Sequence, residues 1–285
     1  MVSSAYLSPL EKSWYYIHRI FCACVLLFLI APILVIIPLS FNSVPFFTYP
    51  LSGLSLRWYG EFFLTEQWQG ALHTSILVAI SVTILSTILG TLAALGLNRP
   101  NFPWRTIVIS ILITPMVVPI VITAVALYFF FASVGLINSY TGVVLAHTIL
   151  AAPFVVIAVT ATLSGFDHSL TRAAAGLGAT PIVVFFKVIL PLILPGMISG
   201  ALFAFVTSFD ELVVALFVAG PEQRTLPMVM YSGVREQVSP TIIAANTVLI
   251  LFSAAMLFTV ELLRRRAERM RGTVGHHGPI KLQSR

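Results

Sequence analysis

The chain has 285 residues, of which 58% are hydrophobic and 9% are charged, and its formal net charge is +6. A typical soluble domain carries about 25% charged residues, so this composition, with a mean hydropathy of +0.99, excludes an ordinary soluble protein. Seven of the sixteen Lys and Arg residues follow Leu263. The positive charge is therefore a tail, which indicates membrane topology and does not indicate nucleic-acid binding.

Six apolar runs are long enough to cross a bilayer, so the sequence predicts an all-α membrane protein with six transmembrane helices in a single domain, residues 1–285. The runs cover residues 20–40, 72–97, 106–131, 142–164, 192–218 and 241–263. The first run has a signal peptide as its alternative, because Lys12 and Arg19 precede it. It is longer than the usual apolar region of about 7 to 15 residues and lacks a clear cleavage site, so we expect it to remain as a span.

The connecting segments carry positive charge mainly on one side of the membrane. Six spans leave both ends of the chain on the same side, and the basic tail, residues 264–285, lies there. Thirteen of the sixteen Lys and Arg residues fall on this side, against Arg57, Arg224 and Arg235 on the other. The positive-inside rule therefore predicts that both termini are cytoplasmic.

The two longest segments on the outer side differ in character. Within residues 42–70, the side chains of Leu56, Tyr59 and Phe63 are spaced to form an apolar stripe on a short helix that lies at the membrane interface. Residues 221–240 contain two Glu and two Arg. That segment is polar enough to meet a soluble partner.

Residues 165–191, between the fourth and fifth spans, contain several residues of the types that begin and end helices. Asp167 is a residue type that caps helix N-termini, and Gly178 suits a left-handed helix end. Thr180 followed by Pro181 is typical of the start of the next helix. The sequence predicts a short, isolated cytoplasmic helix in this segment.

The apolar residues of this short helix form one narrow stripe. Leu170, Ala173, Ala174 and Leu177 fall at i, i+3, i+4 and i+7. A helix of this length is marginal alone in water. Two interpretations remain open: a groove on another protein holds the helix, or the helix packs against loops of its own chain.

The same segment resembles the EAA loop of ABC-importer permeases, whose pattern is Glu-Ala-Ala, three residues, Gly, nine residues, Ile, one residue and Leu-Pro. All of these spacings are kept here, at Arg172, Ala173, Ala174, Gly178, Val188, Leu190 and Pro191. Val188 in place of Ile is conservative. Arg172 stands where the family usually has Glu, which reverses a charge.

This resemblance implies the type I ABC importer permease fold, in which the loop forms a coupling helix that sits in a groove of an ATP-binding subunit. The residues that it implicates in ATPase coupling are Leu170, Arg172, Ala173, Ala174, Leu177, Gly178, Leu190 and Pro191. The reversed charge at Arg172 implies a partner surface that differs locally, or a smaller contribution from this loop.

Outside the loop, the chain resembles the second membrane subunit of spermidine/putrescine-type permeases. The matching stretches are residues 54–59, 208–212, 217–221, 226–227, 231–232 and 238–240. The implied partners are a second permease subunit in a heterodimer, two ATP-binding subunits that hold ATP and Mg, and a periplasmic solute-binding protein, all at the bacterial inner membrane. The implied solute is a polyamine moved by alternating access. An amino-acid-like or opine-like solute is the alternative.

Two acidic residues, Asp210 and Glu211, lie late in the fifth apolar run, where ionisable side chains are costly unless they face water or a partner. One interpretation is that they line the translocation path and favour a cationic solute. The other is a loop cap, or an ion pair with Arg224 or Arg235.

Small and polar residues in the fourth and fifth runs predict contacts between helices. The Gly196-x-x-x-Gly200 pair permits close helix approach, and His147 is a candidate for an interhelical hydrogen bond, with a proton relay as its alternative.

Two rival function classes have less support from the sequence. A secondary transporter or channel would need coupling charges or a selectivity filter within the spans, and only Asp210 and Glu211 are candidates for either. The sequence contains no P-loop, His-Glu-x-x-His, Gly-x-Ser-x-Gly or Cys/His cluster. We therefore expect no enzyme activity and no cofactor in this chain, with ATP hydrolysed by another chain.

Overall fold

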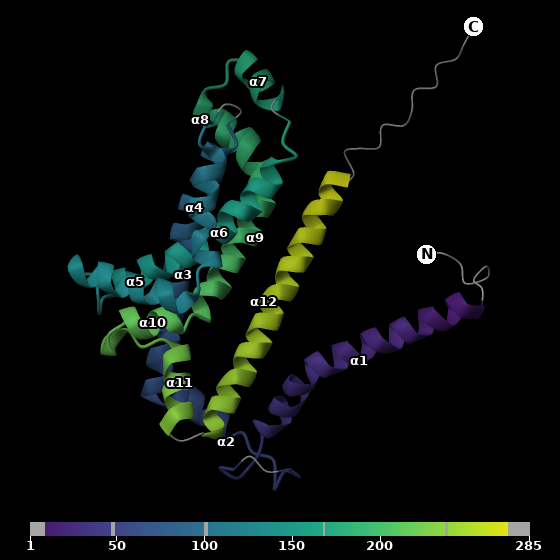
Figure 1. Cartoon of the computed structure of the whole chain (residues 1–285), viewed down its shortest axis with the longest axis vertical. Helices are drawn as coiled ribbons and strands as arrows, with labels where there is room; N and C mark the ends of the chain where they lie inside the picture. The colour runs from purple at the N-terminus through teal and green to yellow at the C-terminus, as the bar shows by residue number, and fades with distance from the viewer. Residues whose placement is uncertain (1–8, 47–48, 100–101, 168, 237–238, 273–285) are drawn as a thin grey trace. The chain divides into compact units, whose positions relative to one another are not determined.

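The computed structural model describes residues 9–46, 49–99, 102–167, 169–236 and 239–272 (Figure 1). The chain divides into two compact units. The first comprises residues 1–65 and 233–250, and the second comprises residues 66–232 and 251–285. Helices α11 (Leu226–Glu236) and α12 (Pro240–Gly272) contribute residues to both units.

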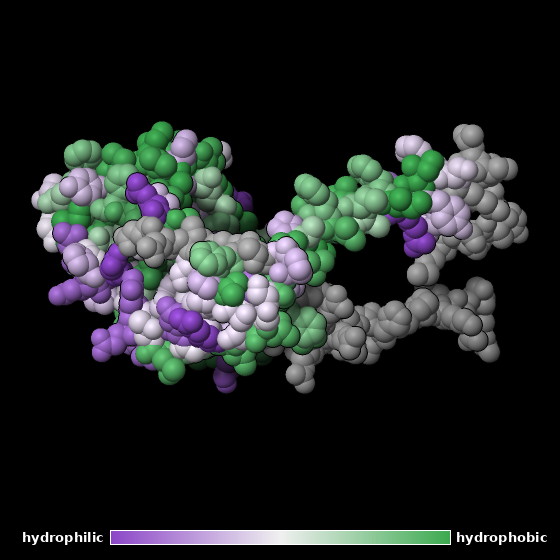
Figure 2. Space-filling view, turned by 90° about the horizontal axis from the view of Figure 1, so that it is seen from below, coloured by the Kyte–Doolittle hydropathy of each residue, from purple (hydrophilic) through white to green (hydrophobic). Residues whose placement is uncertain are grey.

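The first unit begins with α1 (Pro9–Leu39), which includes a 27-residue apolar stretch from Ser13 to Leu39. Nearly all of its large apolar side chains are exposed in the part of the chain that the structure describes. Figure 2 shows α1 coloured mainly as hydrophobic. A helix that is apolar all round and uncovered by its own chain needs lipid or another protein around it. This agrees with the expected first span.

The segment that follows α1 folds onto the short helix α2 (Arg57–Leu64). The Trp58 indole N–H donates to the Asn42 carbonyl at 2.7 Å, and the Tyr59 and Ser40 hydroxyls lie 2.6 Å apart. Leu56 and Phe63 are exposed, as the predicted interfacial stripe requires. Tyr59 is half-buried, with its hydroxyl beside that of Ser40 and its ring beside that of Phe41.

Three long helices form the core of the second unit: α3 (Glu66–Leu97), α6 (Tyr140–Leu163) and α9 (Leu190–Phe209). Figure 1 shows them running side by side. Small residues allow the close approach. A Cβ atom added at Gly90 would lie 2.7 Å from the Val155 Cβ, and one added at Gly200 would lie 2.8 Å from the Val155 Cα. One added at Gly196 would lie 2.8 Å from the Ala158 carbonyl oxygen, so the predicted close packing at Gly196 and Gly200 is confirmed.

The predicted span over residues 106–131 is wrong as a single helix. The structure has two helices, α4 (Arg105–Val117) and α5 (Ile120–Ser133), with 105° between them. Pro119 lacks an N–H group, and a residue before proline avoids the helical region. Accordingly, Val118 is extended, with ψ 135°. Helix α10 (Val213–Val218) packs against α5.

The fifth predicted span, residues 192–218, is also displaced. The helical segment runs from Pro181 to Phe209, through α8 (Pro181–Val184), the π-helical turn η2 (Phe185–Ile189) and α9. Pro191 cannot donate to the carbonyl four residues earlier, and Leu190 N–H instead bonds to the Phe185 carbonyl, five residues back. The helix ends before Asp210, so the predicted span is interrupted there.

The described helices include four that are long and apolar enough to cross a membrane, or five if α4 and α5 form one span. The predicted spans at 20–40, 72–97 and 142–164 each coincide with one of the four. The predicted sixth span, 241–263, falls within α12, whose apolar described part is the shorter segment Pro240–Met256. Six spans in one domain stays a prediction.

Candidate functional site

The short helix predicted between the fourth and fifth spans is α7 (Ser169–Gly176). Its N-terminus is held by Asp167, whose Oδ1 accepts from the Ser169 N–H at 2.8 Å and whose Oδ2 accepts from the Ser169 hydroxyl at 2.6 Å. These bonds satisfy donors that a helix start leaves free. The predicted role of Asp167 as a cap is confirmed.

The C-terminus of α7 is closed by Gly178, which has a φ of +83°. The Gly178 N–H bonds to the Ala175 carbonyl at 3.0 Å, and the Ala179 N–H bonds to the Ala174 carbonyl at 3.1 Å. This pair of bonds is the Schellman motif. It needs one residue in the left-handed conformation, which glycine adopts without steric cost. Thr180 is then extended and Pro181 begins α8, as predicted.

The apolar stripe of α7 is largely uncovered. Leu170 is 45% exposed and Leu177 is 89% exposed, while Ala173 is exposed and Ala174 is half-buried. The chain itself therefore covers Leu177 hardly at all and Leu170 only in part. That a groove on another protein holds the helix stays a prediction. A narrow apolar stripe left open on a short helix is typical of a surface that docks into a groove.

The remaining residues expected in coupling occupy two places. Arg172 is on α7 and is exposed. Leu190 and Pro191 lie instead at the start of α9, after the π turn, with Leu190 half-buried. The motif is therefore divided in space: its first half is the exposed helix, and its Leu-Pro end determines how the chain re-enters the helical bundle.

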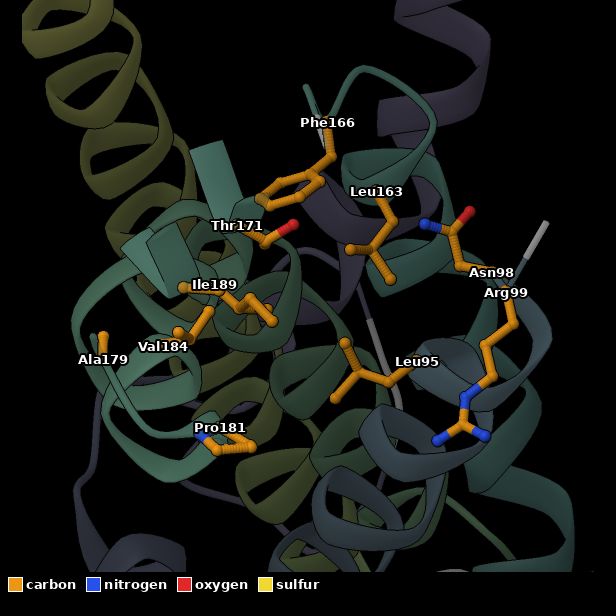
Figure 3. Close-up of a pocket in the computed structure, with 11 residues that line it drawn as sticks. Leu95, Asn98, Arg99, Leu163, Phe166, Thr171, Ala179, Pro181, Val184 and Ile189 are labelled. Carbon is orange, nitrogen blue, oxygen red and sulfur yellow. The ribbon is translucent and has the colours of Figure 1, made fainter. Parts of the chain in front are cut away.

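A pocket of about 430 Å³ lies behind α7, at the same end of the second unit (Figure 3). Thr171 and Ala175 of α7 form one wall, so α7 has its leucines uncovered and its other face on the pocket. The rest of the lining is Leu95, Asn98, Arg99, Leu163, Phe166, Ala179, Pro181, Val184 and Ile189. Sequence reasoning missed this pocket, because no periodicity relates the end of α3 to the end of α6 or the start of α8.

The acidic pair lies at the break between α9 and α10. Glu211 is 8% exposed, and its carboxylate Oε1 accepts from the Val214 N–H at 2.8 Å. The loop-cap interpretation is therefore confirmed for Glu211. Asp210 follows the last residue of α9, donates its own N–H to the Val206 carbonyl, and is exposed. The two carboxylates thus have different surroundings.

His147 joins two helices of the core. The side chain is 1% exposed, and its Nδ1 lies 3.0 Å from the Ser208 hydroxyl, so the bond links α6 to α9. This confirms the predicted interhelical hydrogen bond. Ser208 stands two residues before Asp210, which places the bond next to the α9–α10 break.

Comparison with known proteins gives a consistent family assignment. Residues 86–269 match the family described as binding-protein-dependent transport system inner membrane component. The chain is 36% identical over 251 residues to the putrescine transport system permease protein PotI of Escherichia coli K12, covering 86% of this chain and 89% of the relative. It is 34% identical over 257 residues to the spermidine/putrescine transport system permease protein PotC of Haemophilus influenzae, covering 89% of this chain and 98% of the relative.

A solved structure shares the fold at low sequence identity. One chain of a bacterial ABC transporter that imports the polysaccharide alginate superposes with a TM-score of 0.70 and 15% identity, covering 92% of this chain and 99% of that chain. The predicted family of the chain, that of ABC-importer permeases, and its predicted fold class are thereby confirmed. The chain belongs to the binding-protein-dependent transport system inner membrane component family and is a permease subunit of an ABC importer.

Proposed function

We propose that this chain carries a polyamine, putrescine or spermidine, from the periplasm to the cytoplasm by alternating access. The observation that carries the proposal is the identity of 34 to 36% with relatives named for putrescine and spermidine transport, over at least 86% of this chain. A likeness of that extent reaches beyond the α7 loop into the segments that would line a solute path.

The proposed complex contains a second permease subunit, two ATP-binding subunits that hold ATP and Mg, and a periplasmic solute-binding protein. The exposed stripe of α7 supports the contact with an ATP-binding subunit, since it offers Leu170 and Leu177 to a groove. The exposed apolar surface of α1 supports its placement in lipid or against another subunit. The distribution of Lys and Arg supports cytoplasmic termini in the inner membrane.

Arg172 has a specific place in this proposal. It is exposed on α7, where the family pattern has Glu. An ATP-binding subunit that accepts this loop would offer an acidic or neutral group opposite Arg172, because two like charges at close range repel.

The test is uptake of labelled putrescine and spermidine by cells that lack their own polyamine importers and express the complete system. We expect uptake that depends on this chain and on the ATP-binding partner, with cells that lack either one as controls. If neither polyamine enters, the polyamine proposal is wrong, and amino-acid-like and opine-like solutes become the next panel. Uptake that persists without the ATP-binding partner would overturn the importer mechanism.

Asp210 is the residue that we propose for the cation path. Asp210→Asn is expected to lower the uptake of a dicationic solute about tenfold, because a charge pair near a protein surface is worth on the order of 1 to 4 kcal/mol. The matched control is Glu211→Gln, which removes a charge at the neighbouring position but keeps an oxygen that can accept from the Val214 N–H. Initial uptake rates at equal membrane levels compare the two. Equal losses in both variants would contradict a distinct path role for Asp210.

A further inference from the structure

The pocket behind α7 has the composition of a site for an amphiphile. Eight of its lining residues are apolar, and three, Asn98, Arg99 and Thr171, carry polar groups. Its volume of about 430 Å³ lies in the range of small-molecule sites, roughly 300 to 1,000 Å³. Figure 3 shows Asn98 and Arg99 together at one side of the pocket, with apolar side chains from α6 and from the α8 segment around the rest. The pocket is thus mainly apolar, with a charged edge.

The charge of the lining excludes the proposed solute as its occupant. Arg99 is the charged group of the pocket, and the lining residues that the structure describes include no carboxylate. A putrescine or spermidine cation would meet a guanidinium there, which disfavours binding. An anion is favoured, because a guanidinium binds phosphate through two parallel N–H donors.

The location of the pocket favours a lipid over a free anion. The pocket lies where α3 and α6 end and α8 begins, beside α7. With α7 on the cytoplasmic side, as proposed above, this is the level of the lipid headgroups. Basic pockets between helices at the cytoplasmic end of a membrane domain are typical sites for anionic headgroups, and the apolar lining here suits acyl chains.

We propose that this pocket binds an anionic phospholipid, with the phosphate at Arg99 and an acyl chain along Leu95, Leu163 and Val184. Because Thr171 and Ala175 form one wall, the bound lipid would contact the inner face of α7 while the outer face meets the partner. A lipid in this pocket therefore stabilises α7 from behind, and the anionic lipid content of the membrane sets how firmly α7 is held.

Lipid retention tests the site without any assumption about the transported solute. The chain, with the subunits that co-purify, is extracted from membranes that contain phosphatidylglycerol and phosphatidylethanolamine, washed in detergent, and analysed by native mass spectrometry. We expect phosphatidylglycerol to remain bound, and Arg99→Gln to weaken its retention about fivefold, since a basic residue near an anionic headgroup contributes about that factor. Arg99→Lys keeps the charge and is expected to retain most of the lipid.

Two further variants separate the pocket from general surface charge. Arg105→Gln removes a positive charge at the start of α4, outside the pocket lining, and is expected to retain the lipid. Ala175→Phe fills the pocket from the α7 side and is expected to expel the lipid while Arg99 is intact. Equal loss in Arg99→Gln and Arg105→Gln, or full retention in Ala175→Phe, would overturn the site.

Soluble anions distinguish the two sources of phosphate. If glycerol 3-phosphate or inorganic phosphate displaces phosphatidylglycerol at comparable concentration, the acyl chain contributes nothing and the lipid assignment is wrong. The consequence for coupling rests on the proposed function: ATP hydrolysis stimulated by the binding protein should rise with the phosphatidylglycerol fraction of nanodiscs in the wild type and stay flat in Ala175→Phe. Failure of lipid retention overturns the site alone, whereas failure of polyamine uptake leaves it standing.

Discussion

The Gly178→Asp variant is expected to insert normally and to lose coupled transport by more than tenfold. Gly178 has a φ of +83° and closes α7 through the two C-terminal hydrogen bonds. Asp enters this left-handed region more easily than most L-residues but less easily than Gly, and its negative charge at the C-terminus of α7 opposes the helix dipole. The C-terminus of α7 would unwind or shift, and the apolar stripe that ends at Leu177 would no longer fit its groove.

A clash within the chain does not explain this expectation. A Cβ atom added at Gly178 meets nothing within 4 Å, so the loss must come from the backbone conformation or from the proposed partner. Gly178→Asn separates the charge of Asp from its size, because Asn has nearly the same shape and, like Asp, is among the L-residues that adopt the left-handed conformation. Retained transport in Gly178→Asn with loss in Gly178→Asp would indicate the charge, whereas loss in both would indicate that the backbone turn or the groove does not accommodate a side chain of this size.

The measurements are polyamine uptake and ATP hydrolysis stimulated by the binding protein, at equal membrane levels of each variant. The matched control is Gly60→Asp, the same substitution in the short helix α2, where an added Cβ also meets nothing within 4 Å. That control is expected to transport normally. Normal transport in the Gly178→Asp variant would show that α7 does not couple ATP hydrolysis to transport.

The part of this site that sequence could predict is the part whose signals are local. Asp167, Gly178 and Pro181 each act through the few residues beside them, as a cap, a left-handed turn and a first helical residue. The stripe on α7 is likewise a matter of spacing along one helix. These features therefore appear in the structure at the predicted positions.

The errors in the spans have a different cause. Mean hydropathy over a long window stays high across Val118 and Pro119, although one proline there suffices to turn the chain by 105°. The same averaging extended the fifth span through Asp210 and Glu211, where the helix in fact ends after Phe209. Backbone stereochemistry at single residues determined both helix breaks. A hydropathy average over a long window carries no information about it.

The spacing of residues along the sequence could not predict contacts between residues that are far apart in the chain. His147 was a candidate for a bond between helices, but its partner Ser208 is 61 residues away. Arg99 was interpreted only as a topology charge, although it lines the pocket with Phe166 and Ala179. The first result depends on how α6 packs on α9, and the second depends on how the ends of α3 and α6 meet α7 and α8.

The Gly200→Leu variant is expected to lose a large part of its stability. An added Cβ at Gly200 would lie 2.8 Å from the Cα of Val155 on α6. Backbone atoms cannot move aside as a flexible side chain can, and overpacking of a well-packed interior typically costs about 1 to 3 kcal/mol or more. We expect a decrease in the free energy of unfolding of about 3 kcal/mol, measured by denaturation in mixed micelles, with little folded protein at growth temperature.

Gly96→Leu provides the matched control for this loss. Gly96 lies in α3, the neighbouring long helix, and an added Cβ there meets nothing within 4 Å. The same substitution should therefore leave stability nearly unchanged or slightly improved, because leucine is the better helix former. If Gly96→Leu and Gly200→Leu lose stability equally, glycine is needed for a reason other than contact with α6. If only Gly200→Leu loses stability, the Gly196-x-x-x-Gly200 pair determines how closely α9 packs on α6. The same packing then determines where Ser208 meets His147. It also positions Asp210, at the break between α9 and α10, in the solute path proposed for this chain.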